Sequence, residues 1–226
     1  MIIKLPLILI ISIWFLNGSI EVAGTKVSSY LQYNVIHIDK DQMDFGVSET
    51  RPIDSDFYIN SNFFSDNAPI GLVVVNGKRK SRRVRGGGFF YVLNGNPYVK
   101  SLKCPTWTKF ASQTILWGID NGEINHRLIK TKHAKQKRYR TLMGQNKDEE
   151  IIVISSNRIG LVTIKEILEF SLKFNIVDGI LLDGGTSVDY KFSDDNATTT
   201  FSSVPHSLKN SLDIKHPTTY IYGNFK

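Results

Sequence analysis

Three short apolar runs in this chain each end in residues that turn the backbone back on itself. They are Leu72 to Val75 before Asn76-Gly77, Phe89 to Leu93 before Asn94-Gly95, and Thr114 to Ile119 before Asp120-Asn121-Gly122. Asn-Gly next to an apolar run is the strongest short-range signal for a β-hairpin. The chain is therefore predicted to be rich in strands that pair with their neighbours in sequence.

Other short apolar runs between turn residues predict further strands. These runs are Val35 to Ile38, Phe57 to Ile59, Ile151 to Ile154, Gly179 to Leu182 and Thr219 to Tyr222. Their length is typical of strands and too short for most helices.

One segment carries a full set of helix signals. Thr163 is suited to be the N-cap, and Glu166, three residues later, completes a capping box. Apolar residues recur at helical spacing as far as Phe174, and Asn175 is a suitable stop. A second, shorter helix is predicted near Ser207 to Leu212. The predicted fold class is α+β: a single domain with a strand-rich mixed sheet, hairpins and one main packed helix.

The N-terminus has the layout of a secretory signal peptide. One positive charge lies within Met1 to Lys4, an almost wholly apolar run follows from Leu5 to Leu16, and small residues come next. The apolar run is shorter than the roughly 20 residues that a membrane-spanning helix needs. We predict a signal peptide over 1–24, a mature domain over 25–226 that is secreted or periplasmic, and no membrane span after cleavage. An uncleaved anchor is the alternative.

The charge and the cysteine count limit the kinds of partner. The net charge is +7, and the basic residues are concentrated in two runs, Lys78 to Arg85 and Lys130 to Arg140. Such runs are solvated loops or contact anionic partners. Export argues against chromosomal nucleic acid and favours phosphate-bearing substrates. Cys104 is the only cysteine and the five His are scattered, so we predict no internal disulfide, no metal site and no cofactor.

The segment from Ile180 to Ser187 contains the clearest candidate for chemistry. An apolar run ends in the carboxylate of Asp183, and Gly184, Gly185 and two hydroxyl residues follow. Two glycines let a backbone turn sharply and approach a ligand closely. The segment alone equally fits a Gly-Gly turn with Asp183 as its cap.

Two other polar elements follow predicted strands or basic runs. Asn60 comes directly after a strand, where its amide can contact a ligand or form an Asx turn. Arg138 and Arg140 alternate onto one face of an extended segment. Two guanidinium groups side by side suit a phosphate, although both residues also belong to a basic run that solvent would accommodate.

The order of these elements resembles the phosphodiester glycosidase family. The matching segments are Asn60-Ser61-Asn62-Phe63-Phe64, Pro69-Ile70-Gly71-Leu72, Gly87 to Tyr91, Ser112-Gln113-Thr114, Arg138-Tyr139-Arg140, Leu182-Asp183-Gly184-Gly185-Thr186-Ser187 and Val204-Pro205. The Asp183 segment is the most specific of them. The chain departs from the family pattern at Ser61 and Asn62, where small residues would let a sugar approach, at Ile115-Leu116 in place of Gly-Pro, and at Gly88 in place of Asn.

The resemblance implies hydrolysis of a sugar-1-phosphodiester at its glycosidic bond, releasing a sugar and a phosphomonoester. The implied catalytic residues are Asp183, Arg140 and Asn60. The implied substrate-binding residues are Arg138, Gln113, Gly184, Gly185 and Ser187. Asp66 and Glu166 are candidates for a second carboxylate, Glu166 being better explained by its capping role. The alternatives are a secreted module that binds a glycan or phosphopolymer at a degenerate site, and a phosphodiesterase that attacks phosphorus.

Overall fold

The computed structural model describes residues 19–22, 25–66, 68–101, 104–193, 198–205, 208 and 217–226. The predicted signal peptide lies outside the described residues except for 19–22. The predicted helix near Ser207 to Leu212 lies outside them except for Leu208. Among the described residues, no helix is long and apolar enough to cross a membrane.

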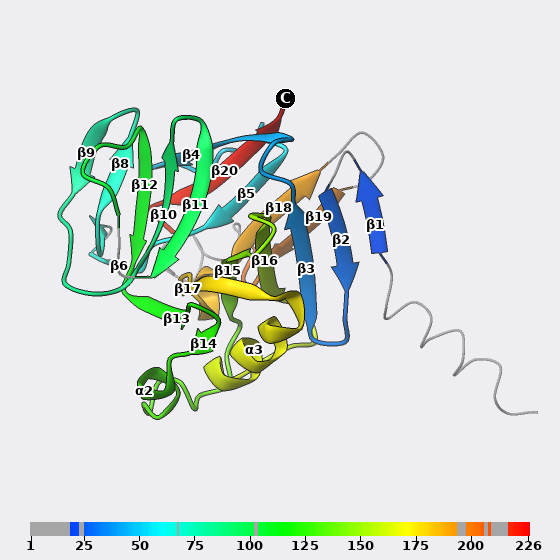
Figure 1. Cartoon of the computed structure of the whole chain (residues 1–226). Helices are drawn as coiled ribbons and strands as arrows, with labels where there is room; N and C mark the ends of the chain where they lie inside the picture. Colours follow the sequence, from blue (N-terminus) through cyan, green and yellow to red (C-terminus); the bar gives the residue numbers. More distant parts are fainter. Residues whose placement is uncertain are drawn as a thin grey trace, which may run out of the picture.

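Three large sheets and one small sheet make up the fold (Figure 1). The largest has the order β1 (Ser19–Val22), β2 (Thr25–Ser29), β3 (Tyr33–Ile38), β16 (Ile151–Ser156), β15 (Thr141–Asn146), β17 (Ile176–Leu181), β13 (Leu116–Asp120), β14 (Glu123–Ile124). A second sheet has the order β11 (Asn96–Ser101), β10 (Gly88–Leu93), β12 (Phe110–Thr114), β8 (Val73–Val75), β9 (Lys78–Ser81). A third has the order β19 (Thr198–Ser202), β18 (Asp189–Ser193), β5 (Phe57–Asn60), β20 (Tyr220–Phe225), β4 (Met43–Ser48). The small sheet pairs β6 (Phe64–Ser65) with β7 (Ala68–Pro69).

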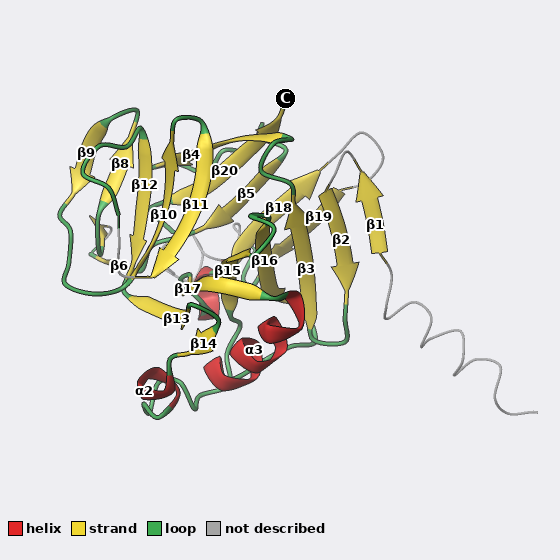
Figure 2. Ribbon diagram, in the orientation of Figure 1, coloured by secondary structure: helices red, strands yellow, loops and turns green. Residues whose placement is uncertain are grey.

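The predicted fold class is confirmed. Strands dominate the ribbon and the helices lie together at one end (Figure 2). These helices are α2 (His126–Ile129) and the longer α3 (Ile164–Ser171), which continues into η1 (Leu172–Phe174). The main helix has the predicted Thr163–Glu166 capping box, and Asn175 ends the segment in the left-handed conformation at φ 55°.

The three predicted hairpins are confirmed at their turns. Each turn places Asn and then Gly at positive φ: 50° and 74° at Asn76-Gly77, 52° and 82° at Asn94-Gly95, 51° and 81° at Asn121-Gly122. These are the values that a type I′ turn requires. The apolar run Thr114 to Ile119 is divided by the structure, because β12 ends at Thr114 and β13 begins in another sheet at Leu116.

The central strands are buried on both faces. Ile151 and Val153 of β16 face the core shared by the three large sheets, whereas Ile152 and Ile154 face the core under α3. Because successive side chains of a strand point to opposite faces, burial on both sides produces the continuous apolar run seen in the sequence. All described strand pairs are antiparallel; β16 and β17 run in the same direction with β15 between them.

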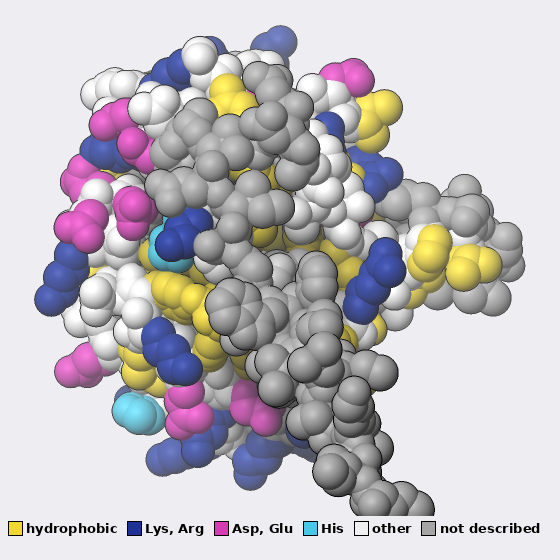
Figure 3. All heavy atoms as spheres, turned by 90° about the vertical axis from the view of Figure 1, so that its right-hand side faces the viewer, with side chains coloured by type: hydrophobic (Ala, Val, Ile, Leu, Met, Phe, Trp, Pro, Cys, Tyr) yellow, Lys and Arg dark blue, Asp and Glu magenta, His cyan; other side chains and the backbone are white. Residues whose placement is uncertain are grey.

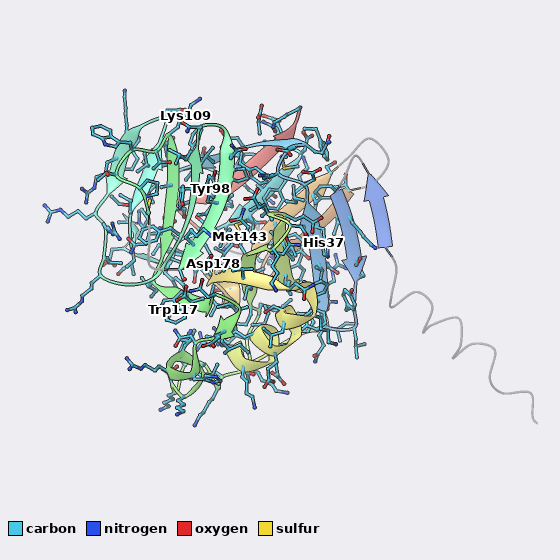
Figure 4. All side chains as sticks on the ribbon, in the orientation of Figure 1. His37, Tyr98, Lys109, Trp117, Met143 and Asp178 are labelled. Atoms are coloured by element: carbon cyan, nitrogen blue, oxygen red, sulfur yellow. The ribbon has the colours of Figure 1, made fainter. Side chains whose placement is uncertain are left out.

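Polar contacts connect β11 to the largest sheet. Asp178 of β17, labelled in Figure 4, accepts from Lys100 Nζ at 2.8 Å and from Ser101 Oγ at 3.0 Å. Both partners belong to β11, so this buried carboxylate joins two sheets at the strand that leads to Asp183.

Candidate active site

Asp183 lies where β17 leaves the largest sheet and meets the end of β5. The Leu182 N–H donates to the Thr141 carbonyl at 3.0 Å, and the Asp183 N–H donates to the Ser61 carbonyl at 3.0 Å. The backbone of Asp183 is therefore fixed between two sheets. Its side chain is half-buried and contributes to the wall of a cavity.

The Asn60 side chain forms hydrogen bonds with both ends of the segment from Asp183 to Asp189. Its Nδ2 donates to the Asp183 carbonyl at 2.8 Å, and its Oδ1 accepts from the Asp189 N–H at 2.9 Å. Asn60 is fully buried. The side chain that the sequence placed in the catalytic set thus bonds the backbone of the Asp183 segment, and it is absent from the residues that line the cavity.

The two glycines after Asp183 are required for different reasons. A Cβ on Gly184 would lie 2.6 Å from the Tyr139 carbonyl oxygen, too close for any other residue. Gly185 adopts φ 65° at the start of η2 (Gly185–Ser187), a conformation that favours glycine. The Gly185 N–H donates to the Tyr139 carbonyl at 2.8 Å. That bond occupies the amide of Gly185, one of the predicted substrate-binding residues, whereas the Gly184 N–H makes no hydrogen bond with a described residue.

The cavity beside Asp183 has a volume of about 510 Å³. Its lining residues are Phe63, Phe64, Lys137, Arg138, Tyr139, Leu161, Asp183, Gly184, Gly185, Thr186 and Ser187. Hollows of about 490 and 500 Å³ exist elsewhere on the described chain, so volume does not choose among them. This cavity is distinguished by its chemistry, because it combines one carboxylate with two exposed cations and a glycine loop.

Arg140 lies behind the cavity wall. It is 5% exposed, and Gly184 packs directly against its backbone and side chain. Its Nη2 donates to the carbonyls of His133 and Gln136 at 3.0 Å each, while Nη1 lies 3.1 Å from His133 Nε2. Its Nε is buried and makes no hydrogen bond within the described part of the chain. The structure therefore separates the predicted arginine pair, since only Arg138 reaches the cavity.

The charge of Arg140 persists at neutral pH. Burial and, to a smaller extent, the nearby Arg138 lower its pKa to about 10, while Asp183 acts in the opposite direction. The pKa of His133 is also lowered, first by burial and then by Arg140 and Arg138. A neutral His133 can accept a hydrogen bond from Arg140, so the lowered pKa of His133 favours this arrangement.

Gln113 is fully buried and lies outside the set of cavity-lining residues. Its Oε1 accepts from the N–H groups of Leu72 and Val84 at 3.0 and 3.1 Å. Its Nε2 donates to the carbonyls of Val84 and Gly86 at 2.9 and 2.6 Å. All four bonds hold the backbone around the basic run Lys78 to Arg85, and none involves the cavity.

Two of the residues that depart from the family pattern, Ser61 and Asn62, form a buried polar cluster with Ser112. Ser61, Asn62 and Ser112 are each fully buried. Ser112 Oγ donates to Ser61 Oγ at 2.9 Å and also bonds Asn62 Oδ1. Asn62 Nδ2 donates to the Gln113 carbonyl at 2.6 Å. The larger side chains at these positions are therefore accommodated in the interior and leave the cavity open.

Neither candidate for a second carboxylate lines the cavity. The Glu166 carboxylate accepts from the Thr163 N–H in the capping box, and Asp66 lies in the β6–β7 turn at φ 49°.

Within the described residues, no group of three or more His, Cys, Asp or Glu is placed to hold a metal ion. Burial raises the pKa of Cys104 to about 11, which keeps its thiol protonated.

The sequence did not single out three residues that the structure brings to this region. Lys137 and His133 lie inside a basic run whose members look alike in sequence. Asp189 is buried and pairs with Arg51, from Nε to Oδ2 at 3.0 Å. The two partners are 138 residues apart, so no local signal connects them.

The comparisons with known proteins place this chain in a family. A family model described as phosphodiester glycosidase matches residues 55–211, more than half of the chain. The chain therefore belongs to the phosphodiester glycosidase family. No curated protein matches the sequence.

Solved structures share the fold at low identity. The chain matches the zebrafish N-acetylglucosamine-1-phosphodiester α-N-acetylglucosaminidase catalytic domain, auto-inhibited by its pro-peptide, with a TM-score of 0.64 and 14% identity over 93% of this chain and 82% of that one. A hypothetical protein from Synechocystis gives 0.64 and 11%, over 93% and 61% of the two chains. A putative exported protein from Burkholderia pseudomallei K96243 gives 0.55 and 11%, over 89% and 75%.

Proposed function

We propose that this protein hydrolyses a sugar-1-phosphodiester, similar to an N-acetylglucosamine-1-phosphodiester, at the glycosidic bond. The observation that carries the proposal is the half-buried Asp183 carboxylate in one cavity wall with Arg138, on a backbone fixed between two sheets. Family membership supports the reaction class, and the zebrafish enzyme of the same fold is named for such a phosphodiester.

The proposed reaction replaces the phosphate ester at the anomeric carbon with water. The bond between the anomeric carbon and the phosphate oxygen breaks, and the phosphomonoester leaves with the electron pair. The water oxygen joins the carbon, and its proton passes to a base. Asp183 acts as that base, as a nucleophile, or by stabilising the oxocarbenium-like transition state, which are the roles open to a carboxylate in glycoside hydrolysis.

Positive groups around the loop suit the leaving phosphate. Arg138 and Lys137 are exposed at the cavity and bind the departing phosphate directly. The Gly184 N–H provides a further donor. Arg140 contributes a fixed charge behind Gly184, and Asn60 positions the loop. Ser187 lies in the cavity wall as a polar contact for substrate. Gln113 supports the neighbouring loop and has no contact role in this scheme.

Hydrolysis in ¹⁸O-labelled water tests the proposal on UDP-linked and aryl sugar-1-phosphates. Label in the released sugar is the expected result. Label in the phosphate would instead identify a phosphodiesterase that attacks phosphorus. Absence of turnover over a panel of sugars, with retained binding, would identify a glycan-binding module with a degenerate site.

We also propose that the mature protein begins near residue 25 and is secreted or periplasmic. Support comes from the N-terminal sequence and from the structural neighbour described as exported. β1 lies inside the predicted signal peptide and pairs only with β2 among the described strands, so its removal leaves the rest of the sheet intact. Intact-mass measurement of the protein recovered from its native host checks this, and a mass that retains residues 1–24 would contradict it.

A further inference from the structure

An exposed tryptophan stands beside two arginines on the second sheet, far along the chain from Asp183. Trp107 is 85% exposed, more than any other large hydrophobic side chain described. It borders a groove of about 370 Å³ that also contains Leu72, Val74, Arg79 and Arg83. We call this the Trp107 groove. It shares no lining residue with the cavity beside Asp183.

The loop that carries Trp107 is anchored on its C-terminal side. The Thr108 hydroxyl lies within hydrogen-bonding distance of the carbonyls of Val92 and Phe110, at 2.6 and 2.8 Å, and the Gly77 N–H donates to the Lys109 carbonyl at 2.8 Å. These bonds fix the backbone next to Trp107. Its exposure is therefore a property of the folded surface, and the indole shares the lining of the groove with Leu72 and Val74.

Contacts with the protein orient both arginine side chains and leave several of their N–H donors available to a ligand. The Arg83 guanidinium lies 4.9 Å from the centroid of the Phe89 ring, and Arg79 Nε donates to the Ser81 carbonyl at 3.0 Å. Neither forms an ion pair with a described residue. A guanidinium carries five N–H donors in a planar fork that matches phosphate and carboxylate groups.

The surroundings of the groove are strongly basic. Six of the eight residues from 78 to 85 are Lys or Arg, and among the described residues the only ion pair of this run joins Lys80 to Glu49. Nitrogen-tipped side chains project outward from the β8–β9 end of the molecule in Figure 4. On the opposite side, acidic and basic side chains are interspersed (Figure 3). The groove therefore attracts an anionic partner.

We infer that the Trp107 groove binds an anionic glycan at a site separate from the candidate active site. The electron-rich face of an indole packs against the C–H face of a sugar ring, and the two guanidinium groups pair with phosphate or carboxylate substituents on the glycan. The groove volume is within the range of ligand pockets. Single-stranded nucleic acid needs several stacking rings along a track, and the groove offers one. An anionic bilayer presents a broad surface, which fits a recessed groove poorly.

Calorimetric titration with soluble polysaccharides tests the inference. Polygalacturonate and dextran sulfate serve as anionic probes and neutral dextran as the uncharged control. Trp107→Ala is expected to weaken binding to the anionic probes about tenfold, the effect of losing a central aromatic contact. Arg83→Gln is expected to weaken it about three- to tenfold.

Matched variants remove similar groups elsewhere on the surface. Ile159→Ala removes another exposed apolar side chain, and Arg158→Gln removes another exposed charge. Both should remain within about twofold of the parent protein. Equal losses in Arg158→Gln and Arg83→Gln, with no effect of Trp107→Ala, would overturn the inference and identify charge-driven adsorption alone. Tighter binding to vesicles with 30% phosphatidylglycerol or to a 20-nucleotide oligo-dT would also overturn it. Thermal unfolding of each variant confirms that the fold is retained.

Discussion

Two loops of this protein are each held by one buried amide side chain, yet they differ in what they carry. Asn60 makes two hydrogen bonds to the ends of the Asp183 segment. Gln113 makes four to Leu72, Val84 and Gly86, next to the basic run. Both amides are fully buried. Of the two loops, only the one that Asn60 holds carries a carboxylate into a cavity. The loop that Gln113 holds exposes Arg82, Arg83 and Arg85 to solvent.

The comparison separates the group that fixes a loop from the group that acts on a ligand. The family resemblance placed both amides at the substrate, and an amide side chain has donors and acceptors that suit sugar hydroxyls. Buried amides must instead satisfy those donors and acceptors inside the protein. The proposed role of each loop thus depends on the residues that it presents to a ligand, and the buried amide only positions them.

Asp183→Asn should give the largest effect. The substitution keeps the shape of the side chain and removes its charge, so kcat should fall by about a thousandfold or more while Tm changes little. Hydrolysis of a UDP-linked sugar-1-phosphate measures the loss. Asp66→Asn is the matched control, expected to stay within about threefold. Unchanged turnover in Asp183→Asn would remove Asp183 from the mechanism, and a comparable loss in Asp66→Asn would restore Asp66 as the second carboxylate.

Asn60→Ala should lower both stability and activity. It leaves the Asp183 carbonyl and the Asp189 N–H without partners in the interior, which costs roughly 2–4 kcal/mol in the free energy of unfolding. The displaced loop should also reduce kcat by about ten- to a hundredfold. Chemical denaturation and steady-state kinetics measure the two effects. A stable Asn60→Ala protein that loses activity alone would point to direct contact between Asn60 and the substrate.

Gln113→Ala should lower stability without a matching loss of activity. Its bonds hold the backbone at Val84 and Gly86, so the free energy of unfolding should fall by roughly 2–4 kcal/mol. Turnover of a small substrate, measured well below Tm, should stay within about threefold. A loss of kcat/KM as large as that of Asn60→Ala would support the sugar-binding role that the family resemblance implies.

His133→Gln should produce the smallest change, visible only in its pH dependence. The pKa of His133 is lowered in the folded protein, so the unfolded chain binds more protons between that value and about 6.5. Stability therefore falls as the pH drops through this window. Gln has no such titration, so its Tm should fall less between pH 7.5 and 5.5, by roughly 1–2 °C. His126→Gln, at another exposed histidine, should follow the parent protein.

The sequence predicted the local elements well and the long-range strands poorly. The three Asn-Gly turns, the capped helix α3 and the apolar strands β16 and β17 were all predicted. β4, β15 and β18 were not, because polar residues interrupt their apolar pattern. Two of them have partners far away in sequence: β4 pairs with β20, and β18 pairs with β5. β15 pairs with the next strand, β16, so in its case only the interrupted pattern hides the strand.

The candidate site shows the same division. Sequence alone identified Asp183, the two glycines and the family, since backbone turns and a strand-end carboxylate follow from residues that are neighbours in the chain. Only the tertiary structure decided that Arg138 reaches the cavity while Arg140 is buried, and that Asn60 and Gln113 bond backbone. Turn preferences act over a few residues, but the partner of a buried polar group depends on which distant strand ends the fold brings beside it.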